Sequence, residues 1–454
     1  MTLRFGTDGL RGVANIELTD DVALCLGRAA AKHLRSTSFL IGADTRQSSP
    51  MLKAALAAGV ASEGIDVIDV GVIPTPGLAW LACNQGVPGA MVSASHNPYM
   101  DNGIKLLSAL GAKLPDATER AIEVDLEVLL ESTPMELTNE GAPQSSVVGG
   151  ISEDLYAVEA YVEHLVATAS DIAESEISVV CDCANGAASN VAAKVFARLG
   201  LNVALIHADP NGTNINEDCG STHPHVVAAA VKEKGADLGI AFDGDADRLI
   251  AVAEDGSIVN GDRLLALFAL DLAERHELAN NGVVITIMAN LGLRRRLAEA
   301  GIAVVETPVG DRYVADALDS NGFVLGGEQS GHIVFRSQAT TGDGILTALK
   351  LIDLLIRKNM TFSKSAASVI ASIPQELRTV PVRNPERLPQ CERIWEEVEA
   401  TRQILGSSGR VLLRASGTEA AVRVMVEAED PDDAVEFVER LAALIGKELG
   451  KPAP

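Results

Sequence analysis

One pattern occurs three times along this chain, and it constrains the fold more than any other feature of the sequence. Each copy begins with an apolar run closed by a short polar turn, starting at Phe39, Ser178 and Val283. A helical segment, a second apolar run, a second helical segment and a third apolar run follow in the same order. Strands that alternate with helices are typical of α/β domains with largely parallel sheets. The repeat therefore predicts three similar α/β domains with mixed sheets.

Glycines divide each copy at equivalent places. One opens the second apolar run and another precedes the third: Gly64 and Gly86, Gly200 and Gly235, Gly301 and Gly322. Glycine commonly ends a helix because it adopts a left-handed backbone without strain. Two helix starts are indicated as well. Thr19 is expected to cap one helix, and Ser49 is expected to cap another with Pro50 at its first position.

Changes in composition and periodicity indicate the domain boundaries. Residues 132–150 are rich in Pro, Gly and Ser, a second boundary falls near 253–262, and the repeat stops after about residue 372. Beyond that point two apolar runs around a turn indicate an antiparallel pair of strands, and Asp430 begins a last helix. We expect four domains. They are α/β domains over residues 1–150, 151–253 and 254–372, and a smaller α+β domain over residues 373–454.

The third apolar run of each copy leads into a polar loop. The three loops read SASHNP from Ser93, DGDADR from Asp243 and GEQSGH from Gly327. Ligands of open α/β sheets bind beyond the carboxyl ends of the strands. We therefore expect the three loops to face one shared cleft.

The DGDADR loop has the composition of a metal site. Asp243, Asp245 and Asp247 place three carboxylates at alternate positions, and hard cations such as Mg²⁺ prefer oxygen ligands. A calcium EF-hand is one alternative, but its sixth position requires glycine and here holds Arg248. The flanking runs also resemble strands rather than helices. A solvated acidic turn is the other alternative.

Ser95 is the candidate nucleophile of the SASHNP loop. It precedes His96 and does not lie in the G-x-S-x-G elbow of α/β-hydrolases. A Ser-His pair of sequence neighbours is also common in ordinary turns. A phosphoserine would add about −1.5 to −2 charges and strong oxygen acceptors. Three carboxylates oversupply negative charge to one divalent ion, so a phosphoserine and the ion would each favour the other.

Two further segments have the composition of ligand sites. Two guanidinium groups, two hydroxyls and a glycine turn suit a phosphate dianion, and they belong to Arg414, Ser416, Gly417, Thr418 and Arg423. An ordinary hairpin turn is the alternative for this segment. In the GEQSGH loop a carboxylate, a hydroxyl and an imidazole could hold sugar hydroxyls and move protons; these groups belong to Glu328, Ser330 and His332.

The overall charge excludes some classes of partner. The chain has 62 acidic and 37 basic residues, a formal charge of −25, so nucleic-acid binding is not expected. It has neither a signal-peptide core at its start nor an apolar run long enough to cross a membrane, so a cytoplasmic protein without membrane contact is expected. The six cysteines form no C-x-x-C pair and are expected to be reduced thiols. Cys181 and Cys183 are expected to point to opposite faces of a strand.

Taken together and in this order, the motifs resemble the α-D-phosphohexomutase superfamily. The similarity covers nearly the whole chain and is carried by FGTDGLRG, SASHNPYMDNGIK, DPNGTNINEDCGSTHP, DGDADRL, PVGDRY, GGEQSGH, TTGDGI and RASGTE. Gln329, together with STHP and TTGDGI, is similar to the branch that acts on glucosamine phosphates rather than mannose phosphates. Ala420 departs from the proline that usually follows SGTE, which leaves this turn less constrained.

The resemblance implies that the four domains surround a central cleft. It also implies roles for the site residues. Ser95 would carry the phosphoryl group and, with Asp243, Asp245 and Asp247, hold one Mg²⁺ per chain. Glu328 and Ser330 would hold sugar hydroxyls. The phosphate that does not react would be bound by Arg414, Ser416, Gly417, Thr418 and Arg423. Lys105 and His332 would be the candidate proton-transfer groups, Arg11 a cleft arginine, and His96 and Arg248 supports of the reacting centre.

The implied reaction moves a phosphoryl group between two positions of a small phosphosugar. Glucosamine 1,6-bisphosphate or another sugar bisphosphate would be the intermediate and activator, and the enzyme would be a homodimer. Within the superfamily, activity on mannose or glucose phosphates is the alternative. A metal-dependent sugar phosphatase and a non-catalytic phosphosugar-binding protein are the alternatives from other functional classes.

Overall fold

A computed structural model describes the chain except residues 1–3, 7–8, 132–146, 174, 417–419 and 451–454. The chain divides into two compact units. The first comprises residues 1–288 and 302–369, and the second comprises residues 289–301 and 370–454. Each unit is built around its own sheets.

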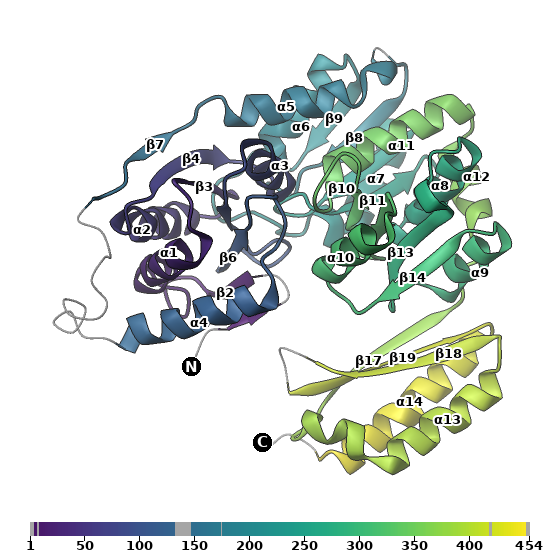
Figure 1. Ribbon diagram of the computed structural model, residues 1–454. Coiled ribbons are helices and arrows are strands. Elements are labelled where there is room, and N and C mark those ends of the chain that lie inside the picture. The colour runs from purple at the N-terminus through teal and green to yellow at the C-terminus, as the bar shows by residue number, and fades with distance from the viewer. Residues whose placement is uncertain (1–3, 7–8, 132–146, 174, 417–419, 451–454) are drawn as a thin grey trace. The chain divides into compact units, whose positions relative to one another are not determined.

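Each copy of the sequence repeat forms the same run of elements, in which two strand–helix pairs precede a third strand, a loop and a fourth strand (Figure 1). The first copy consists of β3 (Ser38–Ala43), α2 (Ser49–Ser62), β4 (Asp66–Val72), α3 (Thr75–Gln85), β5 (Gly89–Val92) and β6 (Asp101–Leu107). The second consists of β8 (Ser178–Asp182), α6 (Ala188–Arg198), β9 (Asn202–Ile206), α7 (Pro224–Lys234), β10 (Leu238–Phe242) and β11 (Leu249–Ala253). The third consists of β13 (Gly282–Thr286), α9 (Leu291–Glu299), β14 (Ala303–Thr307), α10 (Asp311–Asn321), β15 (Leu325–Gly327) and β16 (Ile333–Phe335).

The three sheets share one strand order. The neighbouring strands run β4-β3-β5-β6 in the first copy, β9-β8-β10-β11 in the second and β14-β13-β15-β16 in the third. In every copy the first three strands are parallel and the fourth is antiparallel to the third. The predicted fold class of three similar mixed-sheet α/β domains with a smaller α+β domain is confirmed. The loop between the third and fourth strands is the polar loop of each repeat.

The remaining elements of the first unit extend these sheets or cover them. The first sheet also contains β1 (Phe5–Gly6), β2 (Gly9–Val13) and β7 (Ile151–Glu153), and the second contains β12 (Ile258–Val259). The other α-helices are α1 (Asp20–Leu34), α4 (Asp116–Glu131), α5 (Ala157–Ala167), α8 (Gly261–Glu274), α11 (Gly344–Lys358) and α12 (Phe362–Val369). Short 3-10 helices are η1 (Ser170–Ile172), η2 (Gly220–Thr222) and η3 (Ala279–Asn281).

The helix ends explain why the repeat has glycines at fixed places. Gly86, Gly235 and Gly322 cap α3, α7 and α10 with left-handed φ angles of 67°, 63° and 61°. Thr19 caps α1 as expected, since its side chain accepts a hydrogen bond from the Val22 N–H. The expectation for Ser49 is wrong by one residue. Helix α2 begins at Ser49, and the Ser49 hydroxyl instead donates to Asp44 Oδ1 at 3.0 Å.

The second unit is the smaller α+β part of the chain. Strands β17 (Gln375–Pro381), β19 (Ala421–Ala428) and β18 (Gly409–Ala415) form an antiparallel sheet in that order. Figure 1 shows α13 (Glu392–Leu405) and α14 (Pro431–Glu448) on one face of this sheet. The unit also contains α9 and the 3-10 helix η4 (Pro385–Gln390). Val422, Val424 and Val426 pack in its core, and Asp430 caps α14.

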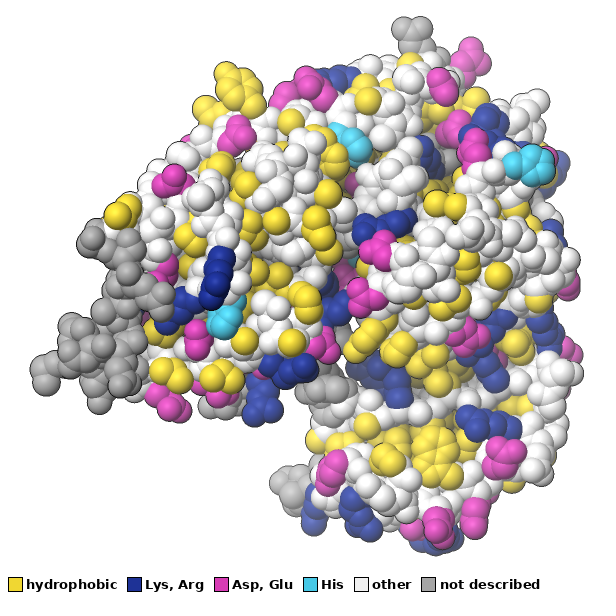
Figure 2. All heavy atoms as spheres, in the orientation of Figure 1, with side chains coloured by type: hydrophobic (Ala, Val, Ile, Leu, Met, Phe, Trp, Pro, Cys, Tyr) yellow, Lys and Arg dark blue, Asp and Glu magenta, His cyan; other side chains and the backbone are white. Residues whose placement is uncertain are grey.

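Three observations bear on the remaining sequence expectations. The sulfur atoms of Cys181 and Cys183 lie 3.8 Å apart, so the expectation that they point to opposite faces is wrong. Side chains two residues apart share one face of a strand. No helix among the described residues is long and apolar enough to span a membrane. Acidic side chains are scattered over the face of the molecule in Figure 2 and do not gather into one patch.

Candidate active site

The three polar loops meet within the first unit. Ser95, after β5, donates its hydroxyl hydrogen to Asp243 Oδ2, after β10, at 2.6 Å. His332, before β16, places Nδ1 3.6 Å from Asp247 Oδ2. Because equivalent loops follow equivalent strands, the repeated topology brings together residues that are more than 200 positions apart in sequence.

The aspartate triad lies in the tight turn between β10 and β11. Asp243, Asp245 and Asp247 are buried, and one carboxylate oxygen of each lies within 4.8 Å of the others. Strands flank the turn on both sides, which excludes an EF-hand, and burial excludes a merely solvated acidic turn. Gly244 is required here because a Cβ atom at this position would lie 2.6 Å from the Ser95 carbonyl oxygen.

The free oxygens of the triad fit a bound cation. Asp245 Oδ1 and Asp247 Oδ1 are buried and accept no hydrogen bond within the described structure. Burying a polar atom without a partner is costly, and such atoms often mark an ion site. Carboxylate oxygens are the ligands that hard divalent cations prefer. The triad can therefore hold a metal ion.

The surroundings shift the pKa values of Asp247 and Asp243 in opposite directions. Burial favours protonation of Asp247, but Lys105, His332 and Arg248 outweigh it and hold the pKa of this carboxyl well below its usual value. Burial and the charges of Asp247 and Asp245 raise the pKa of Asp243 well above its usual value. The surrounding charges therefore favour the ionised form of Asp247 and the protonated form of Asp243.

Ser95 is held in an unusual backbone conformation. Its side chain is fully buried, and its φ angle is +52°, in the left-handed region that non-glycine residues seldom adopt. His96 Nδ1 lies 3.5 Å from Ser95 Oγ. Burial, aided by Arg248 and Arg11, lowers the pKa of His96 to about 4, so this imidazole is neutral at neutral pH.

Two residues that the sequence analysis did not select fix the Ser95 loop. The guanidinium group of the buried Arg46 donates to the carbonyl oxygens of Ser95 at 2.9 Å and Asn97 at 2.8 Å, and also to those of Pro98 and Asp101. Asn216 Nδ2 donates to the same Ser95 and Asn97 carbonyls at 2.9 and 3.0 Å. These hydrogen bonds stabilise the strained turn that presents the Ser95 hydroxyl to Asp243.

The cationic residues predicted from the sequence surround the triad. Lys105, on β6, is buried and donates to Asp245 Oδ2 at 2.8 Å, and its Nζ lies 3.8 Å from Asp247 Oδ2. Arg248 donates its backbone N–H to Asp243 Oδ1 at 3.2 Å, and its Nε lies 3.7 Å from Asp247 Oδ1. Arg11, on β2, donates to Asn97 Oδ1 at 3.4 Å. Thr75, which the sequence analysis also missed, donates to Asp245 Oδ2 at 2.6 Å.

The GEQSGH loop presents a carboxylate and a hydroxyl close together. Glu328 Oε1 accepts from the Gly310 N–H at 3.1 Å, and the Ser330 hydroxyl donates to Glu328 Oε2 at 3.3 Å. His332 is buried, and its Nε2 accepts from the Gly342 N–H at 3.0 Å. The proton of neutral His332 is therefore on Nδ1, which faces Asp247, so both ring nitrogens are engaged inside the protein.

The predicted phosphate segment lies in the second unit. Arg414 on β18 stands directly opposite Arg423 on β19. Burial and the charge of Arg423 lower the pKa of Arg414. Like charges opposite one another destabilise a strand pair, so this arrangement suits an anion bound between them. Ser416 donates its backbone N–H to the Ala421 carbonyl at 2.8 Å, whereas Gly417 and Thr418 lie outside the described residues.

Comparison with known proteins matches this architecture over most of the chain. Profiles of the phosphoglucomutase/phosphomannomutase alpha/beta/alpha domains I, II and III match residues 2–130, 159–256 and 260–373. The C-terminal domain of the same family matches residues 377–444. The chain belongs to the phosphoglucomutase/phosphomannomutase family. The resemblance to the phosphohexomutases is thereby confirmed.

Individual members of this family are similar to this chain over nearly the whole length of both proteins. A phosphoglucosamine mutase of Desulforudis audaxviator is 47% identical over 450 residues, which cover 97% of each chain. The structure of a phosphoglucomutase/phosphomannomutase family protein from Burkholderia thailandensis superimposes with a TM-score of 0.80 at 25% identity, covering 98% of this chain and 97% of the other. An Aspergillus fumigatus N-acetylphosphoglucosamine mutase, solved with GlcNAc-6P and magnesium, shares the fold with a TM-score of 0.71 at 19% identity, covering 99% and 96%.

Proposed function

We propose that the protein interconverts glucosamine 6-phosphate and glucosamine 1-phosphate through a phosphoserine at Ser95. The contact between the buried Ser95 hydroxyl and Asp243 carries the proposal, because it places a nucleophile against a cluster of metal-ligating oxygens. A relative named phosphoglucosamine mutase, 47% identical over 97% of this chain, supports the choice of substrate. The product would feed the synthesis of UDP-N-acetylglucosamine in the cytoplasm.

One Mg²⁺ per chain is the proposed metal. Asp243, Asp245 and Asp247 would hold it together with an oxygen of the phosphorylated Ser95. The ion would neutralise charge that develops on the transferring phosphoryl group. The two buried carboxylate oxygens without hydrogen bonds support this assignment, as does the magnesium in the fungal relative of the same fold.

The protein's own residues direct the transfer. The bond between phosphorus and Ser95 Oγ breaks as a sugar hydroxyl oxygen attacks phosphorus in line, and the hydroxyl proton passes to a neighbouring base. Glucosamine 1,6-bisphosphate forms, turns around, and returns its other phosphoryl group to Ser95. Lys105 is the proposed proton-transfer group: its Nζ, which forms ion pairs with two of the aspartates, would donate a proton to Ser95 Oγ as that oxygen leaves phosphorus. His332 has both nitrogens engaged, which supports a role in positioning Asp247 rather than in direct proton transfer.

The substrate would be held at two places. Glu328 and Ser330 would bind sugar hydroxyls, because a carboxylate beside a hydroxyl offers acceptors and a donor to a vicinal diol. The phosphate that does not react would be bound by Arg414, Ser416, Gly417, Thr418 and Arg423. Each of the proposed domains 1–150, 151–253, 254–372 and 373–454 thus contributes one loop. Arg11, His96 and Arg248 would support the charge of the reacting phosphate.

Replacing Arg423 with Ala is expected to weaken substrate binding more than it slows the chemical step. The guanidinium would contact a phosphate that is bound equally in the ground and transition states, so its loss raises KM. We expect a rise in KM of about tenfold or more with a smaller fall in kcat. Arg383→Ala, an exposed arginine of the same unit, is the matched control and should leave both constants unchanged. A fall in kcat larger than the rise in KM would place Arg423 at the reacting phosphate instead.

The substrate assignment is tested by comparing kcat/KM for glucosamine, glucose and mannose phosphates with a sugar bisphosphate as primer. The hydroxyls bound by Glu328 are common to all three sugars, so discrimination must arise at C2, where glucosamine carries an ammonium group. One such contact is worth about 1–3 kcal/mol, or roughly ten- to two-hundredfold in kcat/KM. We expect glucosamine phosphate to be preferred by this margin, with side activity on the hexose phosphates.

Two results would contradict this assignment in different ways. Faster turnover of mannose or glucose phosphate would mean that the protein is a phosphomannomutase or phosphoglucomutase, while the mechanism stands. Release of inorganic phosphate in place of isomerised sugar phosphate would identify a metal-dependent phosphatase and reject the mutase mechanism.

A further inference from the structure

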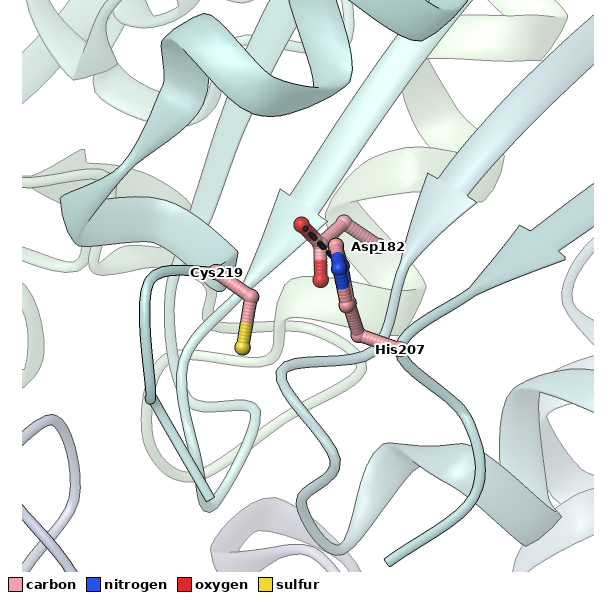
Figure 3. Close-up of side chains that lie close together, drawn as sticks. All are labelled: Asp182, His207 and Cys219. Atoms are coloured by element: carbon pink, nitrogen blue, oxygen red, sulfur yellow. Dashed lines mark ion pairs between the residues drawn. The ribbon is translucent and has the colours of Figure 1, made fainter. Parts of the chain in front are cut away.

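A second cluster of side chains that can bind a metal lies outside the aspartate triad. Asp182, His207 and Cys219 each offer one ligand atom, and these atoms all lie within 4.8 Å of one another (Figure 3). Asp182 ends β8, His207 follows β9, and Cys219 precedes η2. Asp182 and Cys219 are fully buried, whereas the His207 side chain is 34% exposed. Three separate segments of the second α/β repeat thus direct potential ligands to one place.

The chemistry of this cluster differs from that of the triad. The triad offers only carboxylate oxygens, which suit Mg²⁺. A carboxylate, an imidazole and a thiol form the mixed oxygen, nitrogen and sulfur set that Zn²⁺ binds in proteins. Thiolates favour softer cations over Mg²⁺. The two clusters therefore select different metals.

The backbone orients Asp182 towards the cluster. Asp182 Oδ1 accepts from the Ala184 N–H at 2.9 Å, and Oδ2 accepts from the Gly220 N–H at 3.0 Å. An ionised carboxylate has about four acceptor positions, so both oxygens keep capacity for a metal. Hydrogen bonds of this kind commonly fix the ligands of metal sites.

His207 faces this carboxylate without a hydrogen bond. Its Nδ1 atom is buried, makes no hydrogen bond and lies 3.0 Å from Asp182 Oδ2. Such a nitrogen can form an ion pair with Asp182 when the imidazole is protonated, or bind a cation when the imidazole is neutral. A cation that accepts electron pairs from both atoms would satisfy them.

The charges around Cys219 also favour a cation. Three negatively charged side chains, those of Asp182, Asp218 and Glu217, act electrostatically on the Cys219 thiol. A divalent metal would displace the thiol proton to solvent and bind the thiolate. One thiolate, one carboxylate and one neutral imidazole together balance the two charges of the ion.

We propose that Asp182, His207 and Cys219 bind one Zn²⁺ and leave its fourth coordination position open to water. The segment between His207 and Cys219 carries Asn216, whose amide group holds the Ser95 and Asn97 carbonyls. Gly212 in the same segment accepts from the Gln47 N–H at 2.8 Å. The zinc would tie both ends of this segment to β8 and so steady the loop that contacts the Ser95 turn.

Zinc content and cobalt spectroscopy on the full-length protein test the site. The protein is incubated with Zn²⁺, dialysed against excess Mg²⁺, and analysed for bound metal. We expect one zinc per chain in the wild type and also in Asp245→Ala, because the aspartate triad is not involved. Replacement by Co²⁺ should give a thiolate-to-cobalt charge-transfer absorption. Cys219→Ser should abolish this absorption and weaken zinc binding at least tenfold, while Cys25→Ser, which alters a buried thiol on α1, should change neither.

His207→Gln keeps the test decisive if Cys219→Ser does not fold, because His207 is partly exposed and its replacement disturbs no core. It should weaken zinc binding at least tenfold and abolish the rise in unfolding temperature that zinc gives the wild type. The proposal is overturned if the wild type retains no zinc, if His207→Gln or a folded Cys219→Ser variant retains the wild-type amount, or if Asp245→Ala loses it. None of these measurements depends on the mutase activity.

Discussion

Ser95→Ala is expected to remove mutase turnover and leave the fold intact. The hydroxyl is the only part of Ser95 that changes, and it is the atom that would carry the phosphoryl group between the two positions of the sugar. Turnover should fall by at least about a thousandfold, because no other route for the transfer remains. Intact mass measurement should find one phosphate on the wild type and none on the variant.

The backbone contacts of Ser95 explain why the variant should fold. Its carbonyl oxygen still accepts from Arg46 and Asn216, and its N–H still donates to Ser93 Oγ at 2.9 Å. Serine and alanine bear the same strain at a φ angle of +52°. Ser365→Ala, which removes another buried hydroxyl on α12, is the matched control and should keep both phosphate and activity. A Ser95→Ala protein that retained a tenth of the activity would reject the phosphoserine mechanism.

The sequence was sufficient to predict local structure where a local physical rule applies. Gly86, Gly235 and Gly322 end their helices because each adopts a left-handed φ angle. The apolar runs of each repeat form its strands. The same repeat predicted that three loops would meet, since equivalent strands end at equivalent places. Where a rule was misapplied, as for the faces of Cys181 and Cys183, the prediction was wrong.

Long-range contacts could not be predicted in this way. Arg46 lies in the polar turn after the first strand of the repeat, but nothing in that turn indicates that it contacts carbonyls about 50 residues later. Asn216 reaches Ser95 across 121 positions of sequence. Asp245 is a further example of this limit. Its carboxylate was predicted as a metal ligand, whereas its contacts with Thr75 and Lys105 appear only in the folded structure.

Asp245→Ala, or removal of the metal by a chelator, is expected to abolish turnover while substrate binding persists. The substitution removes one of the three carboxylates that would bind the metal. Lys105 Nζ keeps its ion pair with Asp247 Oδ2, 3.8 Å away. We expect kcat to fall by at least about a hundredfold, the order of effect seen when one group that stabilises transition-state charge is removed. Asp255→Ala, an exposed aspartate in the turn after β11, is the matched control and should retain activity.

Titration calorimetry of the chelated protein with glucosamine 6-phosphate separates the two proposed functions of the site. Arg414 and Arg423 stand opposite each other on β18 and β19, and their mutual repulsion is relieved by an anion whether or not a metal is present. The substrate phosphate should therefore still bind to metal-free protein, and Arg423→Ala should weaken that binding further. If binding is lost together with the metal, the phosphate that anchors the substrate must itself contact the metal. The arginine pair would then not be the anchoring site, and the division between a reacting and an anchored phosphate would have to be abandoned.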